Sequence, residues 1–140
     1  MLRHIRVGLT VLLALGMAMT VRAGESPPIV QAEIASLLGR LETSDCKFNR
    51  NGSWYSGEKA KAHMLAKLHY LEARTTLSST EQFIELAATK SSISGKPYLV
   101  QCGDTPAQTS EAWLTTQLKL LRAARAGGSN AASVPAAGHR

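Results

Sequence analysis

Apolar residues recur at helical spacing in four stretches of the chain. In the first, which follows Pro28, they fall three or four positions apart as far as Thr43. In the second, from Gly57 to Arg74, apolar side chains repeat in the same way behind Ser56, a residue type that caps helices. Both stretches therefore predict amphipathic helices with one buried face. The buried stripe expected for the second helix consists of Ala60, Met64, Leu65, Leu68 and Leu71.

Two more helices are expected in the second half of the chain. Thr80 offers a cap to a short helix that ends near Lys90, with Glu81 in its first turn, where the helix dipole favours an acid. Ser110 is the expected cap of the last helix, whose apolar face repeats until Arg125. These two helices complete the helical part of the predicted fold.

Short β-prone runs predict three strands. Two of them flank Asn51-Gly52, the strongest local signal for a type I′ hairpin because both turn residues need positive φ. A two-residue turn there pairs Arg50 with Ser53. The third strand covers residues 98–102 and begins after Pro97, where a missing N–H matters least. The order α-β-β-α-α-β-α predicts an α+β fold, with a small three-stranded antiparallel sheet packed with about four helices.

The two cysteines stand at the outer ends of the first and third predicted strands. If these strands are antiparallel neighbours, the register that pairs Cys46 with Cys102 also pairs Phe48 with Val100 on the same face. A structural disulfide is therefore expected, and it closes a loop of about 55 residues. The alternative, a redox-active or metal-binding pair, lacks a C-x-x-C motif and further ligands at suitable spacing. We expect neither a metal nor another cofactor.

The two ends of the chain differ in composition from its centre. Residues 1–23 have the basic start, the apolar run and the small residues of a cleavable signal peptide, with the cut expected after Ala23. Residues 24–28 are then a linker, and residues 126–140 form a tail expected to be disordered, since Gly, Ala, Ser and Pro supply little apolar bulk. The folded unit is predicted to be a single α+β domain over residues 29–125.

Removal of the leader changes the charge balance. The chain carries 16 basic and 10 acidic residues, and loss of Arg3, Arg6 and Arg22 leaves a net charge of +3. So small an excess is ordinary for a soluble domain and argues against nucleic acid as a partner. The apolar run of the leader is shorter than the roughly 20 residues that span a bilayer, so no integral membrane segment is expected after cleavage. We expect a monomer in an oxidising compartment, the bacterial periplasm.

A polar loop, Ser91-Ser92-Ile93-Ser94-Gly95-Lys96-Pro97, precedes the third strand. Its hydroxyls and backbone N–H groups suit an anion or a peptide. The alternative is a structural role, in which Ser91 and Ser92 satisfy carbonyls of the preceding helix end and Gly95 makes the left-handed turn that directs the strand. The loop is not a P-loop, because the glycine and lysine spacing of that motif is absent.

His63 and Lys67 lie one helical turn apart on the second helix, where Lys67 is expected to face water. His63 could act as a base toward Ser91, Ser92 or Ser94, and the pair would then form the nucleophile and base of a small hydrolase or transferase. A third, orienting group is not evident. The structural alternative is a boundary histidine that forms a hydrogen bond with a neighbouring backbone group.

Trp54 alternates away from Phe48 and Tyr55 along the predicted hairpin. It is expected either to cover the outer face of the sheet beneath a helix, which is the favoured interpretation, or to stand exposed as a binding anchor. Basic side chains near the hairpin could add a patch for acidic envelope components, although most such charges are simply solvated. These side chains are Lys47, Arg50, Lys59 and Lys61.

Three segments of the chain are similar to a known family. FNRNGSWY at 48–55, HMLAK at 63–67 and TEQFIELAATKSSISGKPYLV at 80–100 resemble the YfeK-like family of small exported proteins of Gram-negative bacteria. The resemblance covers nearly all of the expected folded unit and leaves out the C-terminal tail. This family is a domain of unknown function, so the resemblance implies a location and no chemistry.

The sequence therefore predicts an exported, non-catalytic periplasmic accessory or binding protein, whose partner is an unidentified protein or envelope component. The alternative is the serine-dependent enzyme that uses Ser92 or Ser94 with His63. The surface expected to bind a partner combines the hairpin tip with the polar loop. Its residues are Arg50, Asn51, Trp54, Ser91, Ser92, Ser94, Gly95, Lys96 and Tyr98.

Overall fold

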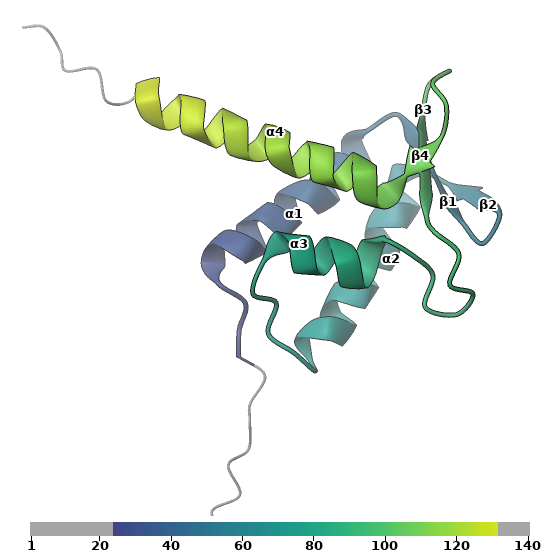
Figure 1. Ribbon diagram of the computed structural model, residues 1–140, viewed down its shortest axis with the longest axis horizontal. Coiled ribbons are helices and arrows are strands. Elements are labelled where there is room, and N and C mark those ends of the chain that lie inside the picture. The colour runs from purple at the N-terminus through teal and green to yellow at the C-terminus, as the bar shows by residue number, and fades with distance from the viewer. Residues whose placement is uncertain (1–23, 132–140) are drawn as a thin grey trace, which may run out of the picture.

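The computed structural model describes residues 24–131, and the expected leader at residues 1–23 lies outside the described residues. The α+β class is confirmed. Figure 1 shows the strands gathered near the N-terminal end of α4, while the C-terminal end of α4 extends beyond the other elements. The elements in chain order are α1 (Pro28–Thr43), β1 (Cys46–Arg50), β2 (Ser53–Tyr55), α2 (Gly57–Glu72), α3 (Thr80–Phe83), the π-helix η1 (Ile84–Ala88), β3 (Leu99–Cys102), β4 (Gln108–Thr109) and α4 (Ser110–Ala131).

The sheet has four antiparallel strands in the order β2-β1-β3-β4, where the sequence predicted three. Its register is the predicted one, because Cys46 pairs with Cys102 and Phe48 pairs with Val100. The additional strand β4 is two exposed polar residues that pair with β3. Such a short strand has no apolar alternation, so the pattern that predicts strands does not detect it.

The hairpin between β1 and β2 is confirmed together with its turn. Asn51 and Gly52 have φ values of 52° and 86°, as a type I′ turn requires, and Arg50 pairs with Ser53. The side-chain oxygen of Asn49 also accepts a hydrogen bond from the Gly52 N–H at 3.2 Å. The turn thereby fixes the direction of β1, which carries residues of the candidate site.

The predicted disulfide is confirmed, since Cys46 and Cys102 are bonded at the end of the β1–β3 pair. It joins residues 56 positions apart in the sequence. The described residues contain no free cysteine. The bond therefore closes the central strand pair β1–β3, which β2 and β4 flank.

Two helix caps lie one residue earlier than predicted. The hydroxyl of Ser79 accepts from the Gln82 N–H at 3.1 Å, and that of Thr109 accepts from the Ala112 N–H at 3.3 Å. Thr80 and Ser110, the predicted caps, are instead the first helical residues, and both are buried. Only the residue before the first turn has its side chain placed to accept from the free N–H groups, so the caps shift. The cap at Ser56 is confirmed.

The last helix is longer than predicted. It was expected to end at Arg125 before a disordered tail, but α4 continues to Ala131. Ala123, Ala124 and Ala126 extend the helix because alanine has the highest helix propensity, and this outweighs the cost of Gly127-Gly128. Residues 132–140 of the expected tail lie outside the described residues.

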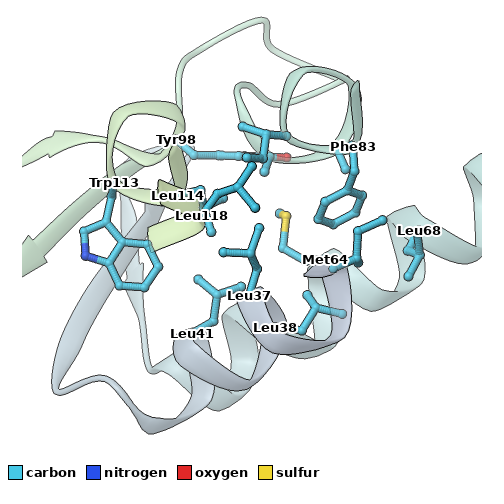
Figure 2. Packing of buried hydrophobic residues seen from close by; sticks show 14 of the residues in the cluster. Leu37, Leu38, Leu41, Met64, Leu68, Phe83, Tyr98, Trp113, Leu114 and Leu118 are labelled. Carbon is cyan, nitrogen blue, oxygen red and sulfur yellow. The ribbon is translucent and has the colours of Figure 1, made fainter. Parts of the chain in front are cut away.

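The core is a cluster of apolar side chains from the helices and from the inner face of the sheet. Figure 2 shows Met64 of α2 pointing into this cluster between Leu37 of α1 and Phe83 of α3. Leu77, in the connection before α3, is fully buried and was not predicted. Leu65 was predicted to belong to the buried stripe of α2, but 37% of it is exposed, because the face that packs on α1 is narrower than the apolar stripe.

A buried carboxylate joins the first and last helices. Glu33 of α1 is 3% exposed, and it accepts hydrogen bonds from Arg122 and Arg125 of α4 and from the Thr80 hydroxyl. The hydrogen bonds from Arg122, Thr80 and Arg125, with that of Arg122 the strongest, lower the pKa of Glu33 to about 2, although burial acts in the opposite direction. Arg122 also pairs with Glu81 at the start of α3. This cluster holds three helices together at the end of the molecule away from the sheet.

The first two helices approach each other closely where α2 begins. A Cβ atom added at Gly57 would overlap the backbone carbonyl of Leu41. By contrast, a Cβ at Gly39 in α1 would meet nothing within 4 Å. Glycine at position 57 therefore allows α2 to start directly against α1. Within residues 24–131, no helix is both long and apolar enough to cross a membrane.

Candidate functional site

A pocket of about 260 Å³ lies between α2 and the strands β1, β2 and β3. One part of its wall is apolar and comes from α1, α2, β1 and β3. Another part is basic and polar and comes from β1, β2, α2 and the residue before β3. The lining residues are Leu41, Phe48, Asn49, Arg50, Tyr55, Lys59, Ala60, His63, Met64, Tyr98, Leu99 and Ser110.

The apolar wall follows from the two-residue alternation of the strands and from the 3.6-residue repeat of the helices. Phe48 is on the same face of β1 as the disulfide, and its ring meets Trp113 of α4 edge to face at 5.7 Å. Met64 lies on the buried stripe of α2, and Ala60 lies one turn before it. The sheet and the helix thus place apolar side chains on opposite sides of the pocket.

The polar wall is centred on His63 of α2. The Arg50 Nη1 atom at the end of β1 lies 2.8 Å from His63 Nδ1, and the Tyr98 hydroxyl lies 3.2 Å from His63 Nε2. The rings of His63 and Tyr98 meet edge to face, with centroids 5.9 Å apart. A strand, a helix and the residue before β3 therefore contribute to one hydrogen-bonded group.

Lys67 lies beside this group and is half-buried, although it was predicted to face water. Its ammonium lies 3.4 Å from the Tyr98 hydroxyl and 5.1 Å from the centre of that ring, and it donates to the Lys90 carbonyl at 3.3 Å. The prediction was wrong because the residues around 90 and 98 pack over this face of α2. Lys67 thereby connects the pocket to the base of the polar loop.

The donors and acceptors in this network can be assigned from their chemistry. Arginine only donates, so Nδ1 of His63 accepts from Arg50, the imidazole is neutral, and its proton is on Nε2. Nε2 then donates to the Tyr98 oxygen, which also accepts from Lys67. The hydrogen of the Tyr98 hydroxyl has no acceptor among the described residues, so it remains available to a ligand.

The pKa shifts agree with this assignment. Burial lowers the pKa of His63 below its usual 6.5, and the charges of Arg50 and Lys67 lower it further. Burial, followed by the charge of Arg50, lowers the pKa of Lys67, while burial raises the pKa of Tyr98. His63 is therefore neutral at pH 7, and Tyr98 keeps its proton.

Arg50 and Lys59 give the pocket a positive charge. The guanidinium of Arg50 lies over the Tyr55 ring at 5.4 Å, and its hydrogen bond is the main cause that lowers the pKa of the Tyr55 phenol. None of the described lining residues carries a carboxylate. Within residues 24–131, no carboxylate lies within ion-pair distance of Arg50, Lys59 or Lys67. The described residues therefore do not neutralise the charge of the site.

The polar loop is folded upon itself beside the pocket. The hydroxyl of Ser91 is buried and accepts from the N–H groups of Ile93 and Ser94, while the Ser91 N–H donates to the Lys96 carbonyl at 2.9 Å. Gly95 has a φ of 71°, the left-handed turn expected for it. Ser91 was expected to bond to carbonyls of the helix end, but its oxygen stabilises the loop instead.

The two segments proposed as a binding surface do come together. The Ser94 hydroxyl donates to the side-chain oxygen of Asn51 at the hairpin tip, and Figure 1 shows the loop before β3 on the side of the hairpin. Ser92 and Lys96 are exposed there. Trp54 is 44% exposed, so it does not lie beneath a covering helix as favoured from the sequence.

The loop serines and His63 do not form a hydrogen-bonded pair in the described residues. The partners of His63 are Arg50 and Tyr98, and none of Ser91, Ser92 and Ser94 lines the pocket. Residues 24–131 also contain no cluster of His, Cys, Asp and Glu side chains that could hold a metal ion.

Comparison with known proteins identifies the family. The model of a family described as "Family of unknown function (DUF5329)" matches residues 28–122, about two thirds of the chain. The chain belongs to this family. It is also 39% identical to the uncharacterised protein YfeK of Salmonella typhimurium over 69 residues, which span 49% of this chain and 56% of that protein. The chain thus spans about half the length of this curated relative, and no solved structure matches it.

The family match covers the pocket completely. The lining residues fall between Leu41 and Ser110, within the matched residues 28–122. The resemblance to YfeK-like proteins inferred from the sequence is thereby confirmed. The last nine described residues of α4 lie beyond the matched segment. The part of the fold that defines the family is therefore the part that builds the site.

Sequence reasoning named Arg50, His63 and Tyr98 separately but did not bring them together. A signal was present, because the predicted register pairs Phe48 with Val100, and its continuation by two residues places Arg50 opposite Tyr98. His63 precedes Met64 on the helix that covers this face. The lining residues that were missed belong to no motif, among them Leu41, Asn49, Leu99 and Ser110.

Proposed function

We propose that this protein is an exported, non-catalytic binding protein of the periplasm, and that its pocket binds a small anionic ligand with an apolar part. The disulfide supports an oxidising compartment, since such bonds rarely persist in the cytosol. The basic, apolar and small-residue pattern of residues 1–23 supports export. The donors and the apolar wall of the pocket support binding.

The observation that carries the proposal is the excess of hydrogen-bond donors in the polar wall. Arg50, Lys67 and the Tyr98 hydroxyl offer more N–H and O–H groups than the described acceptors of the network use. The acceptors are His63 Nδ1, the Tyr98 oxygen, the Lys90 carbonyl and the Tyr55 phenol oxygen, with which Arg50 also forms a hydrogen bond. Charged donors without a counter-charge favour an anionic ligand, because charge-assisted hydrogen bonds are stronger than neutral ones.

The size and the walls of the pocket define the rest of the ligand. At about 260 Å³ the pocket is slightly smaller than the roughly 300–1,000 Å³ typical of drug-sized ligands, so a small molecule fits it best. The apolar wall offers no hydrogen-bond partner to a second polar group of the ligand, because it consists of side chains such as Leu41, Met64 and Leu99. A ligand with one acidic end and one apolar end therefore matches the pocket.

The surroundings of Ser110 and His63 favour binding over catalysis. Ser110 lines the pocket but is 5% exposed, and its N–H donates to the Tyr98 carbonyl as the helix begins. His63 accepts from Arg50 and donates to the Tyr98 oxygen, and no carboxylate among the described residues orients it as a base. Both residues are accounted for by the structure of the site.

The binding proposal is tested by titrating the disulfide-bonded protein with small anions and following backbone amide signals by NMR. The panel contains benzoate, hexanoate, phenyl phosphate and acetate. We expect the two larger carboxylates to shift signals of α2 and β1. Arg50→Gln should weaken binding about tenfold or more, and Lys59→Gln about fivefold, because each removes one charge from a partly desolvated site.

Lys61→Gln is the matched control for Lys59→Gln. Lys61 is on the same helix, but it pairs with Glu42 and does not line the pocket. Its substitution should leave the affinity within about twofold, as for an exposed rim charge. If no anion binds, or if the Lys61 variant weakens binding as much as the Lys59 variant, the proposed pocket function is wrong.

The proposed location is tested separately by cell fractionation and mass spectrometry. We expect the protein in the periplasmic fraction, without its first 23 residues, and lighter than the reduced form by two hydrogen atoms. An uncleaved chain with two free thiols in the cytosolic fraction would contradict export.

A further inference from the structure

His63 has charged or polar groups on every side that faces the pocket. Arg50 contacts it from β1, and Tyr98 contacts it from the residue before β3. Lys67 acts on it from its own helix, while Lys59 and Tyr55 line the same pocket. Each of these groups is a cation or a neutral phenol, so in the free protein nothing among the described residues favours a charged imidazole.

The short contact with Arg50 depends on the neutral form of His63. At 2.8 Å, Nδ1 accepts the N–H of a permanent cation. A proton on Nδ1 would place two N–H groups against each other and would bring two positive charges together. The free pocket therefore holds its imidazole without that proton.

An anion in the pocket reverses this preference. A carboxylate between Arg50 and His63 would accept from the guanidinium and would also accept from a protonated Nδ1. Its negative charge would then separate the two positive charges. The Tyr98 hydroxyl, whose hydrogen has no described acceptor, would supply another donor. Binding of the anion and protonation of His63 thereby favour each other, as linkage requires.

We propose that the pocket binds a small carboxylic acid as its carboxylate together with one proton, and that His63 takes up this proton on Nδ1. The ligand and the proton enter as separate species, RCOO⁻ and H⁺, and no covalent bond forms between protein and ligand. The inference rests on the proposed anion-binding function and adds the chemical class of the ligand and its dependence on pH.

A carboxylate fits the two walls better than a phosphate does. It has two acceptor oxygens, and Arg50 with His63 or Tyr98 can satisfy both at the polar wall. A phosphate monoester carries a third oxygen and a second charge. In this pocket that oxygen would face Met64 or Leu99, where it would lose water without gaining a donor. The carbon body of a benzoate or hexanoate can occupy the apolar side instead.

Proton uptake is measured by isothermal titration calorimetry of benzoate and hexanoate in buffers with different ionisation enthalpies, from about pH 5 to about pH 8. Both acids remain ionised over most of this range, so uptake of a proton reports on the protein. We expect close to one proton per ligand near the middle of the range. We also expect the affinity to rise by up to about tenfold for each unit by which the pH falls there.

A second measurement identifies the group that takes up the proton. The His63 imidazole signals, followed by NMR against pH, should titrate at a higher pH in the presence of saturating benzoate than in its absence. This shift has to match the proton count from calorimetry, because both measure the same linkage.

Two histidine variants test whether His63 itself takes up the proton or whether another histidine can do so. His63→Gln cannot take up a proton, so we expect weaker binding whose affinity no longer changes with pH between about 6 and 8. His69→Gln changes an exposed histidine on the same helix, and it should retain both the affinity and the proton uptake of the parent. Circular dichroism of both variants checks that the fold is kept.

Different results would contradict the role of His63, the choice of a carboxylate and the anion pocket itself. Carboxylate binding without proton uptake, or uptake that persists in His63→Gln, overturns the role of His63 and leaves the anion pocket standing. Binding of phenyl phosphate at least as tight as that of benzoate overturns the choice of a carboxylate. If none of these probes binds to the pocket, the inference and the proposed function both fail.

Discussion

Glu33 shows how a single carboxylate can hold distant parts of this chain together. It is buried, but it accepts hydrogen bonds from Arg122, Arg125 and Thr80, so its charge is balanced. The sequence offered no sign of this role, since Glu33 stands within an apolar helical pattern and its partners follow some 47 to 92 positions later. Only the packing of α1 against α4 brings these residues together.

Glu33 should make stability depend on pH in the acid range. Its pKa is about 2 in the folded protein and 4.5 without such contacts, so its contribution is present above about pH 4.5 and is lost as the pH falls toward 2. Glu33→Gln should destabilise the protein at pH 7 by about 2 kcal/mol, less than a fully buried pair because Arg122 is half-exposed. Urea unfolding at several pH values measures this.

The exposed Glu85 provides the control for that experiment. Glu85→Gln should change stability by no more than about 0.5 kcal/mol at pH 7, and the variant should lose stability in acid as the parent does. If Glu33→Gln shows the same decline below pH 4.5 as the parent, another group is responsible for it.

The helices and strands followed from local patterns wherever a periodic apolar face or a special turn was present. The hairpin at Asn51-Gly52 and the β1–β3 register are examples, because backbone geometry restricts both. The strand β4 and the π-helix η1 were missed. Backbone hydrogen bonds of a π-helix join residues five positions apart, and apolar spacing alone does not distinguish this short turn from an α-helix.

Substitution by alanine should change stability in opposite directions at two glycines, Gly39 of α1 and Gly57 of α2. Gly57→Ala would drive a methyl group into the Leu41 carbonyl, so α1 and α2 must separate, at a cost of about 1–3 kcal/mol or more. Gly39→Ala meets nothing within 4 Å inside α1 and should stabilise the protein by up to about 1 kcal/mol. Thermal unfolding of both variants tests this, and equal effects would argue against the close contact.

At the scale of the whole molecule, the disulfide joins the two halves of the chain through the centre of the sheet. Cys46 begins the hairpin and Cys102 follows the polar loop, so the bond spans almost every residue that lines the pocket. The sequence predicted this bond from the two-residue alternation of the strands. The pocket was not predicted, since its lining comes from six elements whose relative placement no local pattern encodes.

Removal of the disulfide should reduce stability by about 4 kcal/mol, the value for a closed loop of this length in the chain-entropy model. That is a large fraction of the roughly 5–15 kcal/mol typical of a small domain. The Cys46→Ala/Cys102→Ala double variant should unfold at lower urea concentration and be insensitive to dithiothreitol. When its disulfide is reduced, the parent should unfold at a urea concentration close to that of the double variant. A reduced parent as stable as the oxidised one contradicts this.

The contact at Gly57 sets the distance between two helices that line the proposed ligand pocket. Leu41 and Ala60, which face the pocket, belong to the two helices whose spacing that glycine permits. A larger side chain at position 57 would spread these helices apart and widen the cavity between them. Homologues with a bulkier residue there should therefore accommodate longer or branched versions of the proposed acid, although position 57 does not line the pocket.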